Sequence, residues 1–424
     1  MIRRLFVLLA VVLATGIAAC GETLNTSNTC PVLCPSQDVT VHDTVLSPVL
    51  VFDSTFIGYP DRGNELGMLL ATRGDTLETR AIMRFDSLVY FYPVLGDTAR
   101  AIVTVDSSTL KLVFDRTKVT LPATLRFEVY DVDDSTAADT SSAAVLAKFT
   151  PARRIGGITL LRDSLQDTLL VPLSDSAMLA KVTAHGRLRI GVRVDGSGPV
   201  SLLAKSTETG WTAQVRFKGV RDTITAALVV SAYSSTPTGE TDLKTSLTDY
   251  QLVAKYRMPP SPSNTMAIGG IPGRRTYLRF DLPRRITDST TIVRATLWLT
   301  QVRVPFGGAM DTVTIKTHPV LASPLVTDLR RAATILGSTG VGIYDSLMVA
   351  PGDTGVKAIE MYGLVRLWGN QASLLAPPTR SIVLRSEWES ISAGEVRFYG
   401  TNAPLALRPT MRITYIPRVT FGVP

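Results

Sequence analysis

The sequence predicts an all-β protein that contains a duplicated domain, and three observations support this prediction. Long helical patterns are scarce in the 424 residues, whereas short alternating segments recur between Asp-Thr and Asp-Ser pairs. Two of these segments, Arg80–Asp86 and Arg275–Asp281, resemble each other and lie 195 residues apart, close to half of the chain. In both, apolar and charged residues alternate as in a half-buried strand. The length is sufficient for two ordinary hydrophobic cores.

The N-terminus predicts an exported, membrane-tethered chain. Arg3 and Arg4 precede an apolar run, Leu5–Ala19, that is too short to span a bilayer. A charged start, an apolar middle and small residues before a cut site are typical of an export signal. The tetrapeptide Ile17–Cys20 resembles the lipobox of bacterial lipoproteins, which implies a signal peptide at 1–19 and lipid on Cys20. The alternative is an ordinary secretory signal with a coincidental cysteine.

Residues 20–46 are expected to form a flexible tether because they hold few large apolar side chains. Cys30 and Cys34 lie within this segment, and an oxidising compartment would favour a local disulfide between them. Free thiols and a metal site are the alternatives, and His42 is the only histidine nearby. Gly21, in place of an aspartate after the lipobox cysteine, favours the outer membrane or cell surface.

The repeat divides the chain into a first domain at 47–236 and a second at 242–418, joined by the turn-forming segment Ser234–Glu240. Two such units are expected to fold separately. The segment Arg294–Leu299 matches the strand at 109–114, and Val396–Gly400 matches Val215–Gly219. In the first domain, early strands are expected from the apolar residues at 50–52 and 56–57, and further strands at 80–86, 109–114, 125–131, 168–173, 187–194, 200–205 and 213–217.

One short helix is expected among the strands of the second domain. Leu364, Leu367 and Trp368 stand at i, i+3 and i+4, which places them on one side of a helical turn. We expect Trp368 to pack against a sheet rather than to bind a ligand.

The second domain resembles the DNRLRE-type domain of exported bacterial proteins, which is similar to a family of carbohydrate-binding modules. The residues that carry the resemblance are Tyr277–Asp281, Ala295–Leu299, Val365–Trp368 and Arg408–Tyr415, which span most of 242–417. The first domain lacks the Arg-Pro pair and the helical tryptophan. The resemblance implies two tandem jelly-roll-like β-sandwich domains after a lipoprotein signal peptide, a link to cell-surface polysaccharide, and no catalytic residue.

Two tryptophans are tentative carbohydrate-binding residues. Trp298 alternates with threonines and aligns with Lys111 of the first domain, so it is either exposed as a sugar platform or covered by a loop or by the neighbouring unit. Trp388 lies between Glu387 and Glu389 in an expected strand that would place both carboxylates on one face. For these glutamates a solvated face is favoured over contacts to sugar hydroxyls, and catalysis comes last because glycosidases place their carboxylates on opposite sides of the sugar.

Several other functions lack support in the sequence. The three histidines are dispersed, and no nucleophile elbow, phosphate loop or metalloprotease motif is present. The formal charge of +8 is spread out, so nucleic acid is not an expected partner. Loop acids such as Asp53, Asp61 and Glu65 could hold a structural calcium ion, but without ligand spacing that would establish it. Arg84 with Asp86, and Arg279 with Asp281, are candidate same-face ion pairs.

Together these features predict a non-catalytic, lipid-anchored surface protein that binds polysaccharide through its sandwiches. The partners expected are a membrane, through the lipid, and a glycan. A structural or assembly protein that binds other proteins is the second hypothesis, and a glycoside hydrolase or other hydrolase is the third. No cofactor is expected, and the sequence does not identify the ligand.

Overall fold

The computed structural model describes fourteen stretches of the chain, and residues from Asp43 onward form one compact unit. Cys20, Cys30, Cys34 and Asp61 lie outside the described residues, as do all of the expected signal peptide and most of the expected tether. Within the described part, no helix is both long and apolar enough to cross a membrane. The described residues are 40–57, 65–86, 88–94, 97–133, 142–207, 210–211, 213–219, 228–231, 249–257, 259–305, 311–320, 346–369, 380–389 and 391–418.

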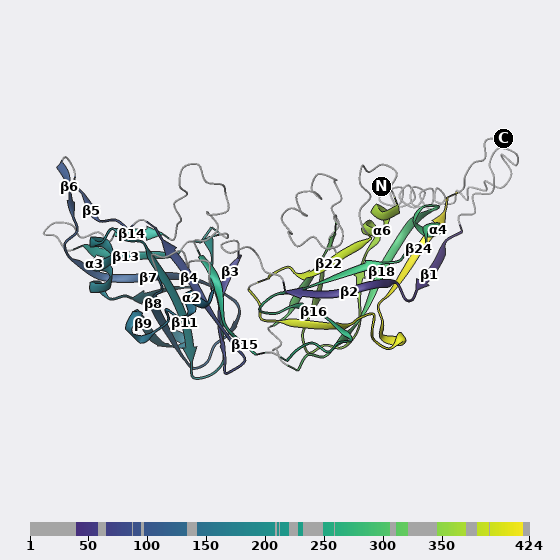
Figure 1. Cartoon of the computed structure of the whole chain (residues 1–424), viewed down its shortest axis with the longest axis horizontal. Helices are drawn as coiled ribbons and strands as arrows, with labels where there is room; N and C mark the ends of the chain where they lie inside the picture. Colours follow the sequence, from purple (N-terminus) through teal and green to yellow (C-terminus); the bar gives the residue numbers. More distant parts are fainter. Residues whose placement is uncertain are drawn as a thin grey trace, which may run out of the picture. The chain divides into compact units, whose positions relative to one another are not determined.

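The expected all-β fold is confirmed, because the chain forms two large antiparallel sheets of eleven strands each (Figure 1). The order in the first sheet is β14-β13-β7-β12-β3-β4-β11-β8-β9, with β10 paired to β7 and β15 paired to β4. Its strands are β3 (Gly67–Arg73), β4 (Leu77–Phe85), β7 (Val105–Thr120), β8 (Thr124–Asp131), β9 (Arg154–Leu161), β10 (Thr168–Pro172), β11 (Leu188–Gly196), β12 (Val200–Lys205), β13 (Gln214–Gly219), β14 (Leu228–Ser231) and β15 (Asp249–Tyr256). A separate hairpin pairs β5 (Phe91–Val94) with β6 (Asp97–Ala101).

The order in the second sheet is β1-β24-β18-β23-β16-β17-β22-β19-β20, with β21 paired to β18 and β2 paired to β17. Its strands are β1 (His42–Leu46), β2 (Leu50–Ile57), β16 (Thr265–Gly269), β17 (Arg274–Phe280), β18 (Thr290–Val302), β19 (Val313–Pro319), β20 (Ser346–Val349), β21 (Gly355–Glu360), β22 (Ser381–Ser386), β23 (Glu395–Tyr399) and β24 (Thr410–Pro417). The two sheets therefore repeat one topology, strand for strand.

One long strand in each sheet closes the sandwich by passing from one layer to the other. In the first half, β7 pairs with β13 through Val105–Lys111, with β10 through Thr109–Val113 and with β12 through its later residues. In the second half, β18 pairs with β21 and β24 and then, at Gln301 and Val302, with β23. Strands that change layers in this way let a single sheet enclose its own core.

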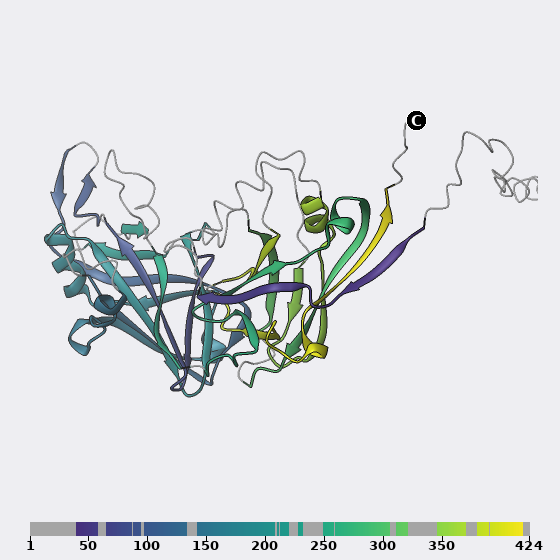
Figure 2. The ribbon, with the colours of Figure 1, turned by 45° about the vertical axis from the view of Figure 1, so that its right-hand side comes forward.

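The N-terminal strands of the two halves are exchanged between the sheets. In sequence, β1 and β2 precede the first half and β14 and β15 precede the second. In the fold, however, β1 and β2 occupy in the second sheet the places that β14 and β15 occupy in the first. Figures 1 and 2 show the purple β1 and β2 among the green and yellow strands of the second sheet. The expected ranges 47–236 and 242–418 thus differ from the sheets at their N-terminal strands.

The same carboxylate contact secures each exchanged strand. Asp53 on β2 accepts hydrogen bonds from the backbone N–H and the hydroxyl of Thr401 at 3.0 and 2.6 Å. Asp249 on β15 accepts the equivalent pair from Thr207, both at 2.8 Å. In register, Asp53 pairs with Leu278 of β17 and Asp249 with Met83 of β4. The repeat thus extends to the contacts that hold β2 and β15 in place.

The strand pairing also corrects one alignment within the repeat. Met411 pairs with Leu297, as Val215 pairs with Leu110, so β24 is the counterpart of β13. The expected match of Val396 with Val215 is wrong, because β23 occupies the place of β12. The match of Leu297 with Leu110 agrees with the pairing. Apolar residues alternate in β12, β13, β23 and β24 alike. The sequence pattern therefore could not show which strand of one half corresponds to which strand of the other.

Each sheet encloses a separate core. The first contains Phe85, Phe127 and Phe217, and the second contains Phe280, Trp368 and Phe398, all with no more than 3% of their surface exposed. Aromatic side chains of this size contribute roughly 1.5–3 kcal/mol each when fully buried. These residues come from strands that lie far apart in sequence, so both cores depend on long-range pairing.

The expected helix in the second half is confirmed as α6 (Tyr362–Gly369), and Trp368 is fully buried with its ring 5.3 Å from that of Phe280. A helix that was not expected, α3 (Asp175–Thr183), begins after Ser174, whose hydroxyl accepts a hydrogen bond from Ala177 N–H. The other helices in the described stretches are α2 (Ser142–Leu146), α4 (Arg284–Thr287) and three short 3-10 turns at Pro151–Arg153, Arg162–Ser164 and Leu405–Leu407.

The two candidate ion pairs on the central strands have different outcomes. Arg84 Nε lies 3.0 Å from Asp86 Oδ1, as expected for a same-face pair. No salt bridge joins Arg279 to Asp281 within the described part of the chain, and both residues are exposed. The pair is therefore a property of the first half rather than of the repeat.

Candidate functional site

Glu387, Trp388 and Glu389 lie in a turn rather than in a strand. β22 ends at Ser386, and the three residues that follow turn the chain away from the sheet. The expected shared face for the two carboxylates is therefore wrong. The alternating pattern Ser-Glu-Trp-Glu-Ser continued the strand in sequence, but the ladder between β22 and β19 ends at Ser386.

The turn separates the two glutamates into different environments. Glu389 is 7% exposed, and both of its carboxylate oxygens accept hydrogen bonds of 2.7 Å from Arg275 of β17. Glu387 lies near the surface, with Lys316 Nζ 3.4 Å away. A carboxylate with both oxygens bound to a buried guanidinium is a poor proton donor or nucleophile. Glu389 therefore supports the turn and the strand beneath it rather than a reaction.

His318 of β19 lies beside this ion pair and is held in its neutral form. Its Nε2 accepts a hydrogen bond from Nε of Arg385 at 3.1 Å. Burial, together with the charges of Arg385, Lys316 and Arg275, lowers the pKa of His318 from 6.5 to about 4. At neutral pH the imidazole is therefore an uncharged member of a cluster whose other basic side chains, on β17, β19 and β22, are cations.

Replacement of His318→Gln is expected to remove a pH dependence of stability. Because the unfolded chain binds a proton near pH 6.5 and the folded chain only near pH 4, the stabilisation is complete above pH 6.5 and is lost as pH falls toward 4. The free energy of unfolding should therefore fall by about 3 kcal/mol over this pH range. Urea unfolding at pH 7 and pH 4.5 measures it. If both proteins lose stability equally over this range, His318 is not protonated on unfolding.

Trp388 is 39% exposed and lines a cavity of about 300 Å³. Asp115 and Thr117 of β7 form a polar part of the lining, and Asp115 Oδ1 accepts hydrogen bonds from the N–H and hydroxyl of Thr117 at 2.9 and 2.7 Å. The full lining consists of Asp115, Thr117, Leu203, Thr312, Trp388, Ile391 and Ser392. An aromatic ring beside a carboxylate and hydroxyls provides one apolar surface and several hydrogen-bonding groups in one concave site.

A partly buried ion pair fixes one wall of this cavity. Asp311, which is adjacent to Thr312, accepts hydrogen bonds of 3.0 and 2.7 Å from the two terminal nitrogens of Arg73. A Cβ atom added to Gly394 would lie 1.9 Å from the carbonyl oxygen of Asp311, so the backbones approach too closely for any other residue. The lining residue Thr312 is thus held by contacts on both sides.

Trp298 is half-buried and does not form an open platform. It lies on β18 between Thr410 of β24 and Ala358 of β21, and neighbouring Thr296 is buried. Lys111 occupies the equivalent place on β7 and is likewise neither buried nor fully exposed. The alternation that placed Trp298 with the threonines holds, but strands on both sides limit access to its ring.

Trp211, which the sequence pattern did not single out, is 49% exposed in the first half. Lys205 Nζ lies 4.3 Å from the centre of its ring. Neither Trp211 nor Lys205 lines the two cavities described for the chain. An exposed tryptophan without a concave surface around it is a useful control for Trp388.

The candidate calcium residues are engaged in other contacts. Asp53 is bound to Thr401, and the backbone carbonyl of buried Glu65 accepts a hydrogen bond from Ser206. Among the described residues, no group of three or more His, Cys, Asp or Glu side chains is arranged to hold a metal ion.

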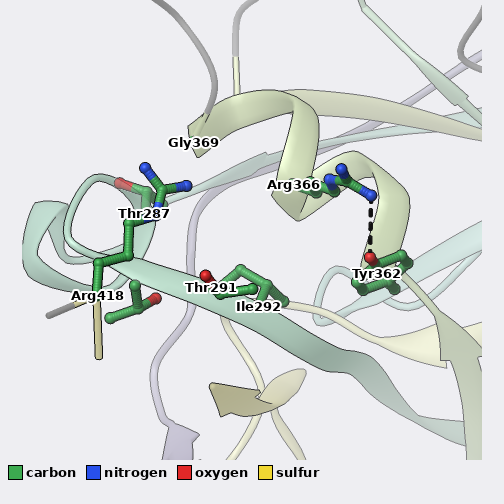
Figure 3. Close-up of a pocket in the computed structure, with 8 residues that line it drawn as sticks. Thr287, Thr291, Ile292, Tyr362, Arg366, Gly369 and Arg418 are labelled. Carbon is green, nitrogen blue, oxygen red and sulfur yellow. Dashed lines mark hydrogen bonds between the residues drawn. The ribbon is translucent and has the colours of Figure 1, made fainter. Parts of the chain in front are cut away.

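A second cavity, of about 330 Å³, lies where α4, α6 and the ends of β18 and β24 meet. Figure 3 shows Arg366 above Tyr362 on one side and Arg418 beside Thr287 on the other, with Thr291 between them. The lining consists of Thr287, Thr290, Thr291, Ile292, Tyr362, Arg366, Gly369 and Arg418. The sequence did not indicate this site, because its residues come from segments up to about 130 positions apart that carry no common motif.

Comparison with known proteins does not place the chain in a family. No family model matches it, and no curated protein matches it. Among solved structures, the Macrobrachium rosenbergii nodavirus is similar at 8% identity with a TM-score of 0.17, covering 92% of this chain and 94% of that chain. The infectious bursal disease virus Gt strain is similar at 13% identity with a TM-score of 0.13, covering 92% and 78%. With scores this low, the identification of the chain rests on its own fold and cavities.

Proposed function

We propose that the chain is a non-catalytic, lipid-anchored surface protein whose sandwiches bind polysaccharide at the cavity lined by Trp388. The observation that carries the proposal is an indole ring, 39% exposed, in a concave site of about 300 Å³ beside the hydroxyls of Thr117, Thr312 and Ser392. Sugar rings have apolar faces that pack on aromatic rings and hydroxyls that need hydrogen-bonding partners. The lipid anchor follows from the lipobox-like residues that end at Cys20.

The environment of the glutamates favours binding over hydrolysis. Glu389 is paired with Arg275, and Glu387 lies outside the lining of the Trp388 cavity. The cavity does contain one acid, Asp115, which is hydrogen-bonded to Thr117. Hydrolysis of a glycoside needs two carboxylates on either side of the sugar, and the described lining supplies one.

Replacement of Trp388→Ala is expected to weaken glycan binding by about tenfold or more, since a well-packed aromatic contact contributes on the order of 1–2 kcal/mol. The mature chain with Cys20→Ser, which keeps both sandwiches and lacks the lipid, would first be screened on a glycan array. The best glycans would then be titrated by calorimetry against wild-type protein and the variant.

Trp211→Ala is the matched control, because it removes a tryptophan that is more exposed but lines neither described cavity. Its glycan affinity should equal that of the wild type. Equal affinity of Trp388→Ala and wild type for a bound glycan would exclude the cavity as the binding site. Absence of binding to every glycan would instead favour the structural or protein-binding alternative.

A further inference from the structure

The cavity between α4 and α6 has a cationic lining, and no acidic residue is among the described residues that line it. Arg366 and Arg418 are its charged residues, and both are exposed. Arg366 Nη1 donates to the hydroxyl of Tyr362 at 3.2 Å, and no salt bridge to either arginine is present among the described residues. Two guanidinium groups at one cavity favour an oxyanion, and arginine in particular binds phosphate through paired hydrogen bonds.

Two acids beside the lining, Asp288 and Glu360, accept hydrogen bonds from groups other than the two arginines of the cavity. Asp288 Oδ1 accepts a hydrogen bond of 2.6 Å from the hydroxyl of Thr287. Glu360 Oε1 accepts from the backbone N–H groups of Ala295 and Tyr362, and its Oε2 accepts from Arg294. The positive charge of Arg366 and Arg418 is therefore not neutralised by acids that line the cavity.

The walls of the cavity are rigid, so the two arginines extend from fixed positions. Trp368 anchors α6 in the core, and a Cβ atom on Gly369 would lie 2.4 Å from the carbonyl oxygen of Thr287. The backbone N–H of Arg418 donates to the carbonyl of Ser289 at 3.0 Å. Binding residues on packed helices and strands lose less conformational entropy when a ligand binds than binding residues on loops do.

The cavity lies at the end of the sandwich where the tether begins. Asp43 near the start of β1 accepts hydrogen bonds from Arg412 and Thr414 of β24, four or more residues before Arg418. Figure 2 shows the start of β1 and the end of β24 at the same end of the second sandwich. Only 22 residues separate Cys20 from Asp43, so a lipid on Cys20 would keep the membrane within about 75 Å of this end.

Two further arginines lie next to the lining of the cavity. Arg284 and Arg285 of α4 are exposed next to the lining residue Thr287. Arginines near a membrane surface are attracted to anionic lipids. An anchor and a second, weak contact on the same chain reinforce each other, because the second binding event becomes intramolecular.

We propose that the cavity lined by Arg366 and Arg418 binds the phosphate of an anionic lipid headgroup in the membrane to which the chain is tethered. The inference depends on the lipid anchor in the proposed function and is independent of the glycan site at Trp388. Arg366 and Arg418 hold the phosphate oxygens, and the hydroxyls of Thr291 and Tyr362 provide further hydrogen-bonding groups. The contact orients the second sandwich on the membrane rather than leaving it free on its tether.

The test uses the mature chain with Cys20→Ser, so that binding does not depend on the lipid. Co-sedimentation with phosphatidylcholine vesicles that contain phosphatidylglycerol, compared with phosphatidylcholine alone, measures the affinity. Arg366→Gln and Arg418→Gln are each expected to reduce binding about fivefold, and the double variant about 25-fold. Arg279→Gln is the matched control, because it removes an equally exposed arginine from β17 and should leave binding unchanged.

Charge-conserving variants separate a shaped site from diffuse attraction. Arg366→Lys together with Arg418→Lys should still lose several-fold in affinity, since lysine cannot form the paired hydrogen bonds. Full retention of binding by this variant would overturn the proposed site, as would equal binding of Arg279→Gln and the double glutamine variant. Binding to inorganic phosphate but not to anionic vesicles would mean an adventitious ion only, and binding to an acidic polysaccharide in place of vesicles would also overturn the proposal.

The two proposals fail in distinguishable ways. Trp388→Ala should bind anionic vesicles as the wild type does, and the double arginine variant should bind glycans as the wild type does. Loss of vesicle binding in both variants would show that the two cavities are not separate sites and would overturn the inference. Release of the chain from membranes by Cys20→Ala in cells tests the anchor by itself.

Discussion

A fragment that spans 242–418 is expected not to fold, although the repeat in the sequence marks it as a complete domain. It lacks β1 and β2, which belong to the second sheet, and it contains β15, which belongs to the first. Loss of β2 removes the partner of β17 along Arg274–Phe280 and exposes the core around the place of Leu50. Buried apolar side chains contribute roughly 1.5–3 kcal/mol each, and a strand without its neighbour also leaves backbone groups unpaired.

A permuted fragment provides the matched control. Residues 259–418, a short Gly-Ser linker and then 40–57 contain all eleven strands of the second sheet. The linker needs little length, because Asp43 is hydrogen-bonded to Arg412 and Thr414 near the end of β24. This fragment and residues 65–257 should each give dispersed NMR spectra and cooperative melting. Cooperative folding of 242–418 alone would contradict the exchange.

Replacement of Glu389→Gln is expected to destabilise the protein by about 3–5 kcal/mol, because it leaves a buried guanidinium without its partner. Arg275 is 6% exposed, and both of its hydrogen bonds to Glu389 measure 2.7 Å. Since a domain of this size has a total stability of roughly 5–15 kcal/mol, the loss should be evident in a denaturant melt.

Glu387→Gln is the control, two residues away in the same turn. Its partner Lys316 lies 3.4 Å away, and both side chains are partly exposed, so the expected cost is about 0–1 kcal/mol. The double variant Arg275→Met with Glu389→Leu should recover part of the loss, because no buried charge of this pair remains. Equal effects of Glu387→Gln and Glu389→Gln would show that Glu389 is solvated.

The sequence was sufficient for features that depend on local periodicity. The alternation at Arg80–Asp86 and Arg275–Asp281 identified the two equivalent strands, β4 and β17, at the centre of the repeat. The i, i+3, i+4 spacing that ends at Trp368 identified α6 and its buried face. Both signals are read within a few residues, so they do not depend on which distant segments meet.

The exchange of strands could not be predicted in the same way. A strand pattern specifies which side chains face the core, but not which of two similar sheets accepts the strand. Thr207 and Thr401 donate equivalent hydrogen bonds to Asp249 and Asp53, so either half offers a suitable partner. The duplication that revealed the fold also made the choice of partner ambiguous.

The candidate sites show the same limit. Trp388 was selected because it is a tryptophan between polar residues, yet the cavity around it includes Asp115 and Thr117, more than 250 positions earlier in the chain. Glu389 was expected to share a face with Glu387, and only the fold shows that it pairs with Arg275. Arg366 and Arg418 come together through the packing of α6 against α4, which a sequence pattern does not specify.

Engineered disulfides test the strand exchange most directly. Thr55 on β2 pairs with Thr276 on β17, and their hydroxyl oxygens are 2.9 Å apart. Without exchange, β2 would pair with β4, and Thr55 would lie opposite Ala81, which now pairs with Gln251 of β15. Two variants, Thr55→Cys with Thr276→Cys and Thr55→Cys with Ala81→Cys, would be made in a chain whose native cysteines are replaced by serine.

Non-reducing electrophoresis and intact-mass analysis of the monomer after mild oxidation give the result. Cysteines on paired strands lie within the range that a disulfide spans, whereas cysteines on strands of different sheets do not. The exchange predicts a disulfide within one chain for the 55–276 pair and none for the 55–81 pair. A disulfide in the 55–81 variant, or a 55–276 disulfide that forms only between two chains, would contradict it.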